Sequence, residues 1–221
     1  MEELKINSLL DLNETIAFMI FKNSIYPWEV IPKISEFILT LGNELNLSKF
    51  EKKAENIWIA KSAKVASTAH IEGPCIIDEN AEIRHSAFIR GNVIVGKNVV
   101  VGNSTELKNV IIFNNAQVPH YNYVGDSILG YKSHMGAGSI ISNLKSDKTL
   151  VTVKYNDEKI ETNLKKFGAI LGDNVEVGCG SVLNPGTVIG KHTNIYPLSS
   201  IRKVVPANSI YKNQNEIVEK L

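Results

Sequence analysis

Hydrophobic residues recur at every sixth position over much of the chain, which is the strongest pattern in the sequence. A first run continues without a gap through Ile59, Val65, Ile71, Ile77, Ile83, Ile89, Val95, Val101, Leu107 and Phe113. A second run comprises Leu171, Val177, Leu183, Ile189, Ile195 and Ile201. The fourth residue after each of these positions is usually small or β-branched. A period of six is neither that of a helix nor that of a single alternating strand.

A coil of short strands accounts for this period, with one hexad on each of three sides and about 18 residues per turn. The periodic aliphatic residues then point inward, and tight corners are rich in Gly, Asn and Asp, as in VGKN, VGNS, LGDN and IGKH. One coil cannot bury its inner face alone, so the coils stack. The sequence therefore predicts an all-β solenoid, a parallel β-helix of hexapeptide repeats, over residues 53–206.

The repeat is interrupted in the middle of the chain. The spacing becomes irregular after Phe113, and the pattern vanishes from Leu144 to Lys166. The segment LVTVKYNDEKIET reads as a strand, a turn at Asn156-Asp157 and a second strand. We therefore expect a hairpin to leave the coil at about residues 145–166. Insertions in solenoids often gather on the binding face.

The two ends of the chain lack the repeat. Within residues 1–52, Asn13 can cap a short helix that extends through Phe21, and Pro27 begins a second helical segment that ends at Gly42. We expect a small α-helical region that either caps the open end of the solenoid or docks a partner. Residues 207–221 are expected to form a final strand and a short helix.

The composition narrows the class of protein. The formal net charge is +1, so there is no electrostatic signal for nucleic acid or for an anionic membrane. Two cysteines cannot form a disulfide framework. The chain begins MEELK, which is not the start of a signal peptide, and the apolar run Ile16–Phe21 is too short to span a membrane. We expect a cytoplasmic protein. Aromatic residues make up only 7%, as suits a narrow prism.

The densest cluster of unusual residues reads GNSTELKN (102–109), then PHYNYVGDSILG (119–130), then HMGAGSIISN (134–143). Here the chain resembles the acetyltransferase half of bifunctional N-acetylglucosamine-1-phosphate uridylyltransferase/glucosamine-1-phosphate acetyltransferase, and more closely the archaeal sugar-1-phosphate nucleotidylyltransferases. Lys108 lies 12 residues before His120, 15 before Tyr123 and 18 after Arg90, which are the family's intervals. Asn143 matches the Asn that follows the family's GAG motif.

The resemblance implies a left-handed β-helix, although the general rule for crossovers alone would favour a right-handed coil. It implies a homotrimer with sites at subunit junctions and acetyl-CoA as co-substrate. The implied activity is N-acetylation of an amino-sugar 1-phosphate. The implied roles are general base for His120, substrate binding for Arg90, Lys108, Tyr123 and Asn143, and acyl-donor binding for Ala137, Cys179 and Tyr196.

The residue types suit this chemistry. An unprotonated amine must attack a thioester, and His, whose ordinary pKa is near neutrality, can accept the proton that is lost. Arg90 and Lys108 each follow a periodic aliphatic residue, so they should lie on the outer surface of adjacent coils, about 5 Å apart in the backbone. Two cations so close are unfavourable unless an anion lies between them, which favours a phosphate site.

Three departures from the bacterial pattern point to altered substrate or donor handling. His134 stands in place of an Asn, Leu144 in place of a Tyr, and Tyr196-Pro197 in place of a small pair. Residues 1–52 are also too few for an α/β nucleotide-binding domain, so we expect acetyl transfer without nucleotidyl transfer.

Two other functions compete with this one. The chain could be a non-catalytic trimeric scaffold, or the partner of a separate sugar nucleotidyltransferase docked through residues 1–52. A zinc enzyme of the hexapeptide carbonic anhydrase kind requires three converging imidazoles. His85 and His120 are 35 residues apart, but the third His is missing, so no metal is predicted.

Overall fold

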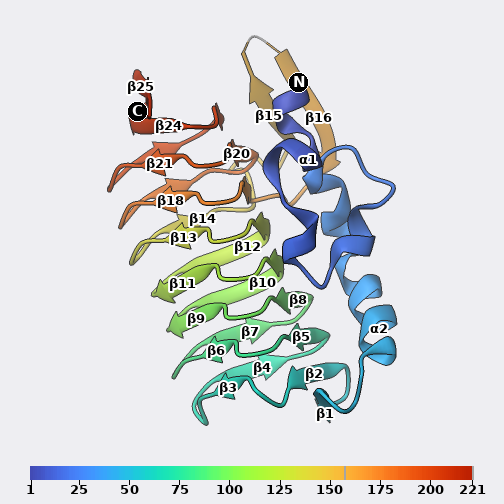
Figure 1. The fold of residues 1–221 in the computed structure, drawn as a ribbon. Coiled ribbons are helices and arrows are strands. Elements are labelled where there is room, and N and C mark those ends of the chain that lie inside the picture. Colours follow the sequence, from blue (N-terminus) through green and yellow to red (C-terminus); the bar gives the residue numbers. More distant parts are fainter. Residues whose placement is uncertain (157, 221) are drawn as a thin grey trace.

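Short parallel strands stack into a β-solenoid in the computed structural model, which describes residues 1–156 and 158–220 (Figure 1). Face one contains β2 (Ile57–Ala60), β5 (Cys75–Ile77), β8 (Val93–Val95), the ends of β10 (Glu106–Ile112) and β12 (Tyr123–Leu129), β17 (Ala169–Leu171), β20 (Thr187–Ile189) and β23 (Val204–Val205). Face two contains β3 (Lys64–Val65), β6 (Glu82–Ile83), β9 (Val100–Asn103), β11 (Gln117–His120), β13 (His134–Met135), β18 (Glu176–Val177), β21 (Asn194–Ile195) and β24 (Ser209–Asn213).

Face three completes the triangle. It contains β4 (His70–Glu72), β7 (Phe88–Arg90), the beginnings of β10 and β12, β14 (Ile140–Ile141), β19 (Val182–Leu183) and β22 (Ser200–Ile201). Strands β10 and β12 run around the corner from face three to face one. The solenoid expected from the period of six is therefore confirmed.

The periodic aliphatic residues fill the interior of the prism. From Ile77 to Leu107, and again from Leu171 to Ile201, they are buried in one continuous core. Phe113 is the exception: Ile112 takes the inward position there, and Phe113 packs outward on Phe21 of the N-terminal segment. At the first coil the interior is more open, and Val65 retains 38% of its exposure. The first coil thus forms an end of the stack that is only partly closed.

Residues 1–50 lie along face one and do not cover that end; the segment is blue in Figure 1. Its elements are η1 (Glu2–Leu4), α1 (Ile6–Leu9), η2 (Leu12–Glu14), η3 (Phe18–Phe21), η4 (Pro27–Lys33) and α2 (Ile34–Glu44). The outward side chains of face one are aliphatic as well, and the segment buries them: Ile76, Ile94, Ile111, Ile128, Ile170, Val188 and Val204. Face one therefore buries apolar side chains both in the solenoid interior and under the N-terminal segment.

The helix expected from Asn13 to Phe21 is two separate 3-10 turns. The side chain of Asp11, rather than Asn13, caps the first turn by accepting from the Asn13 amide at 3.0 Å. So short a segment gains little from helix propensity, and its contacts with face one decide its path. The second expected segment is divided at Pro32, which lies near the end of η4, just before α2. A proline removes an interior helix hydrogen bond, which accounts for the division.

The insertion and the tail are both antiparallel hairpins. Between β14 and β17, β15 (Val151–Tyr155) pairs with β16 (Glu158–Leu164); Asp157 of the expected turn lies outside the described residues. At the end of the chain, β25 (Glu216–Glu219) folds back on β24 where a short helix was expected, and Leu221 lies outside the described residues. At the other end, β1 (Phe50–Ala54) folds back on β2 in the same way. Both added edge strands pair with the terminal coils.

The part of the chain that the structure describes contains no helix long and apolar enough to cross a membrane.

Candidate active site

The corner between faces two and three brings together the residues predicted for catalysis and for acyl-donor binding. The Gly138 amide donates to the His120 carbonyl at 3.0 Å, and the Gly180 amide donates to the Ala137 carbonyl at 2.9 Å. On the next coil, the Leu198 amide donates to the Cys179 carbonyl at 2.9 Å. His120, Ala137 and Cys179 therefore lie on successive coils at one corner, about 5 Å apart per coil. We call this the 120/137/179 corner.

The imidazole of His120 is exposed at the end of β11, and a buried side chain fixes its backbone. Asn122 accepts a hydrogen bond from the His120 amide at 3.1 Å. The Asn122 amide group donates to the carbonyls of Gly136, at 2.9 Å, and Ser139, at 3.1 Å. Asn122 thus joins the coil of His120 to the coil of Ala137. We did not anticipate this role from the sequence, where Asn122 reads as one more polar corner residue.

Face three carries the two predicted cations on adjacent coils. Strands β7 and β10 pair through Phe88 and Glu106, which places Arg90 next to Lys108. The Arg90 guanidinium lies 2.6 Å from the Glu106 carboxylate. The repulsion that we expected an external anion to relieve is therefore partly relieved by the protein itself. Glu106 is a site residue that the hexad pattern alone does not reveal.

The positive charge of Lys108 is less well compensated than that of Arg90. Partial burial lowers the pKa of its ammonium group, the nearby Asp126 carboxylate opposes that shift, and the cations Lys166 and Arg90 add to it. Lys166 belongs to the segment that returns from the inserted hairpin. Nothing in the sequence pattern indicates that it would reach Lys108, because 58 positions separate the two and no repeat relates them.

A buried carboxylate organises the edge of face three that adjoins face one. Asp126 is only 5% exposed and accepts from the side-chain amides of Asn109, at 2.8 Å, and Asn143, at 2.5 Å. Asn143 also donates to the Tyr123 hydroxyl at 3.3 Å. A Cβ at Gly125 would lie 2.6 Å from that hydroxyl, so only glycine leaves room for the Tyr123 side chain here. Burial is the main reason why the pKa of Tyr123 is raised.

The predicted residues therefore form two groups at the two edges of face three. The 120/137/179 corner lies at one edge, with Tyr196 on the coil of Leu198. Arg90, Lys108 and Asn143 lie toward the other edge, and Tyr123 begins the strand that connects the two. Each strand of face three spans only two or three residues, roughly 7–10 Å.

His134, which differs from the bacterial pattern, lies apart from both groups. His134 is on face two, where its Nδ1 lies 2.8 Å from the Glu176 carboxylate. Among the described residues there is no group of three His, Cys, Asp or Glu side chains that could hold a metal ion.

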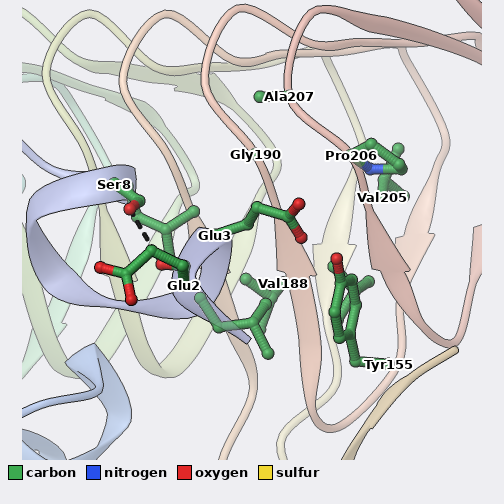
Figure 2. Close-up of a pocket in the computed structure, with 12 residues that line it drawn as sticks. Glu2, Glu3, Ser8, Tyr155, Val188, Gly190, Val205, Pro206 and Ala207 are labelled. Carbon is green, nitrogen blue, oxygen red and sulfur yellow. Dashed lines mark hydrogen bonds between the residues drawn. The ribbon is translucent and has the colours of Figure 1, made fainter.

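A small, mostly apolar hollow of about 170 Å³ lies between the N-terminal segment and the last coils of face one (Figure 2). Glu3 and Tyr155 line it, and at its side the Ser8 hydroxyl donates to the Glu2 carbonyl at 2.9 Å. The hollow belongs to the seam between the N-terminal segment and the solenoid, apart from the predicted site residues.

A family model described as the GMPPB C-terminal domain matches residues 71–191, more than half of the chain. A curated relative named bifunctional protein GlmU, from Methanococcus aeolicus, is 38% identical over 117 residues, which are 53% of this chain and 28% of that protein. Another, named bifunctional sugar-1-phosphate nucleotidylyltransferase/acetyltransferase, from Sulfurisphaera tokodaii, is 33% identical over 49% of this chain and 27% of its own length. The chain thus matches less than a third of each relative.

Among solved structures, a mutant of AntD, an N-acyltransferase from Bacillus cereus in complex with dTDP and coenzyme A, is 19% identical with a TM-score of 0.39; the match covers 73% of this chain and 84% of that one. The resemblance expected from the hexapeptide motifs, to proteins that combine sugar-phosphate and acetyl-transfer activities, is confirmed by the curated relatives.

Proposed function

The chain belongs to the GMPPB C-terminal domain family, and from this premise we propose that it transfers an acetyl group from acetyl-CoA to the amine of an amino-sugar 1-phosphate. The observation that carries the proposal is the 120/137/179 corner. It places an exposed imidazole one coil away from a stretch of open backbone, and both adjoin a face that carries cations. The relative from Sulfurisphaera tokodaii is named for both sugar-1-phosphate and acetyl transfer, which supports this pairing.

The corner fits an extended thioester. Gly138 and Gly180 have positive φ angles, and nothing lies within 4 Å of the position that a Cβ of Gly138 would occupy. Backbone groups are therefore accessible between the side chains of Tyr121 and Leu198 on the flanking coils. Acetyl-CoA, when bound there, supplies an acyl group activated as a thioester.

Residues of the chain would bind the acceptor substrate and accept the proton of its amine. His120 would accept the proton that the amine loses as its nitrogen bonds to the acetyl carbon, and would return it to the thiolate of coenzyme A that leaves when the C–S bond breaks. This role typically contributes about 10² to 10⁴-fold. Arg90 and Lys108 bind the phosphate, Arg90 as a planar fork and Lys108 as a point charge. Tyr123 and Asn143, held by Asp126, bind sugar hydroxyls. Positioning amine and base together lowers the entropic part of the barrier.

We also propose that the active assembly is a homotrimer joined near this corner. Leu198 is 85% exposed with a φ of 58°, and Tyr121 is 63% exposed with a φ of 52°. Left-handed backbone costs a non-glycine residue roughly 1–2 kcal/mol. Large side chains exposed in this conformation are typical of an interface, which supports contact with another copy of the chain here.

A coenzyme A release assay tests the activity. Amino-sugar 1-phosphates, the corresponding free amino sugars and nucleotide-linked amino sugars would each be offered with acetyl-CoA. We expect the highest kcat/KM with a 1-phosphate. Release of no coenzyme A with any of these acceptors would overturn the proposal and favour a non-catalytic role.

A further inference from the structure

Lys166 places a second ammonium group beside Lys108, from outside the hexapeptide repeat. It lies in the short connection between β16 and β17, which returns the chain from the inserted hairpin to the solenoid. Lys166 precedes Phe167 and Gly168, whose amides donate to the Asn143 and Asp126 carbonyls, and Lys108 pairs with Gly125, next to Asp126, so both lysines lie at the same edge. The charges of Lys166 and Arg90 both contribute to the lowered pKa of Lys108. Three cations thus converge on one edge of face three.

The backbone at Lys166 is fixed on its carboxyl side. The Phe167 amide donates to the Asn143 carbonyl at 3.0 Å, and the Gly168 amide donates to the Asp126 carbonyl at 2.8 Å. The Phe167 side chain is fully buried and packs on Trp28, with ring centroids 5.9 Å apart. The position of Lys166 is therefore set by the same residues that form the proposed substrate site.

Neither nearby carboxylate forms an ion pair with Lys108 or Lys166. Glu106 is paired with Arg90, and both oxygens of Asp126 accept from neutral amides. Within residues 1–156 and 158–220, no carboxylate oxygen lies within 4.0 Å of the ammonium nitrogen of Lys108 or Lys166. The Asp126 carboxylate offsets part of the positive charge near Lys108, but one carboxylate beside two ammonium groups leaves a net positive charge, which favours the binding of a dianion.

We propose that Lys166 is a specificity-determining residue of the phosphate subsite, which with Lys108 binds the doubly charged form of a phosphomonoester. This inference rests on the proposed function, because it concerns the same site. At neutral pH a phosphomonoester carries about −1.5 to −2 charges, since its second pKa is near 6. A neutral sugar hydroxyl offers no such charge. The insertion therefore selects sugar 1-phosphates over free amino sugars.

The test is a calorimetric titration of the full-length protein with glucosamine 1-phosphate and, separately, with glucosamine, both without acyl donor. Lys166→Ala should weaken binding of the 1-phosphate about 10- to 100-fold, as expected for one charge-assisted hydrogen bond. Binding of glucosamine should be unchanged. Lys166→Arg should restore most of the affinity.

Lys165→Ala is the matched control, since it removes an equal charge from the adjacent exposed position. We expect it to bind the 1-phosphate like the unmodified protein. Affinity unchanged by Lys166→Ala, or lowered equally by Lys165→Ala, would overturn the inference. The titration contains no acyl donor, so a protein that binds but does not turn over contradicts the proposed function and leaves the role of Lys166 intact.

Thermal unfolding separates binding from a structural role. Lys166→Ala removes a repulsion, so in phosphate-free buffer its Tm should equal or exceed that of the unmodified protein. A clear fall in Tm would instead show that Lys166 supports the fold and would overturn its assignment to the subsite.

Discussion

The Arg90 guanidinium forms a 2.6 Å ion pair with the Glu106 carboxylate on the neighbouring coil. Exposed pairs of this kind contribute little to stability, because water screens the two charges. The main effect of the ion pair is to orient the Arg90 guanidinium on face three and to reduce its repulsion of the Lys108 ammonium group.

Replacing Arg90 by Ala should therefore affect substrate binding more than stability. We expect the KM for an amino-sugar 1-phosphate to rise about 10- to 100-fold, because a charge-assisted contact to phosphate is lost. The free energy of unfolding should be almost unchanged. Arg84, which pairs with Glu82 on face two, provides the control. Equal effects of Arg84→Ala and Arg90→Ala on KM would contradict the assignment.

Asp126 should be important for stability as well as for the site. Its replacement by Ala removes an acceptor from the half-buried amide groups of Asn109 and Asn143, at a cost of about 1–3 kcal/mol. Urea unfolding would measure this loss. Asp126→Asn tolerates the φ of 48° but offers a donor where an acceptor is required, so an intermediate loss is expected. The exposed Asp147→Ala should change little, and an equal loss there would count against the network.

Leu198 tests the proposed assembly. We expect the unmodified protein to be a trimer by light scattering, and Leu198→Asp to dissociate it, because a buried unpaired carboxylate is costly at an interface. Leu47, also exposed but in the turn before β1, is the control, and Leu47→Asp should remain trimeric. A monomeric unmodified protein, or a trimeric Leu198→Asp variant, would exclude the proposed interface.

The two cysteines should differ in reactivity. Burial raises the pKa of the Cys75 thiol to about 12, whereas Cys179 is exposed at the 120/137/179 corner. Iodoacetamide should thus modify Cys179 alone in the native protein and both thiols in urea, as seen by mass spectrometry. Bound coenzyme A should slow the modification of Cys179. Modification that proceeds equally fast at saturating coenzyme A would place the donor elsewhere.

The sequence was sufficient to predict the solenoid and the adjacency of Arg90 and Lys108, because both follow directly from a period of six. The corner that His120 shares with Ala137 and Cys179 could not be predicted from the period alone. The spacing between hydrophobic residues becomes irregular after Phe113, so the position of each later residue on its coil was not known from the sequence. In the structure, the irregularities fall at corners, so the strands stay in register across them.

Contacts between segments far apart in the chain could not be predicted in this way. Lys166 reaches Lys108 because Phe167 packs against Trp28, and that contact depends on how the N-terminal segment lies on face one. The position of this segment follows from the outward aliphatic stripe, which includes Ile94 and Ile111. Periodicity marks these residues as hydrophobic neighbours of the core residues but does not say what covers them.

The most direct test of the account is transfer of an isotopically labelled acetyl group from acetyl-CoA to an amino-sugar 1-phosphate, with His120→Ala and His85→Ala compared. His85 is also exposed, lies at the same corner two coils from His120, and is assigned no role in the proposed site. The account predicts a labelled N-acetyl product, a kcat/KM about 10² to 10⁴-fold lower for His120→Ala, and no change for His85→Ala. Full activity of His120→Ala, or absence of labelled product from the unmodified protein, would contradict it.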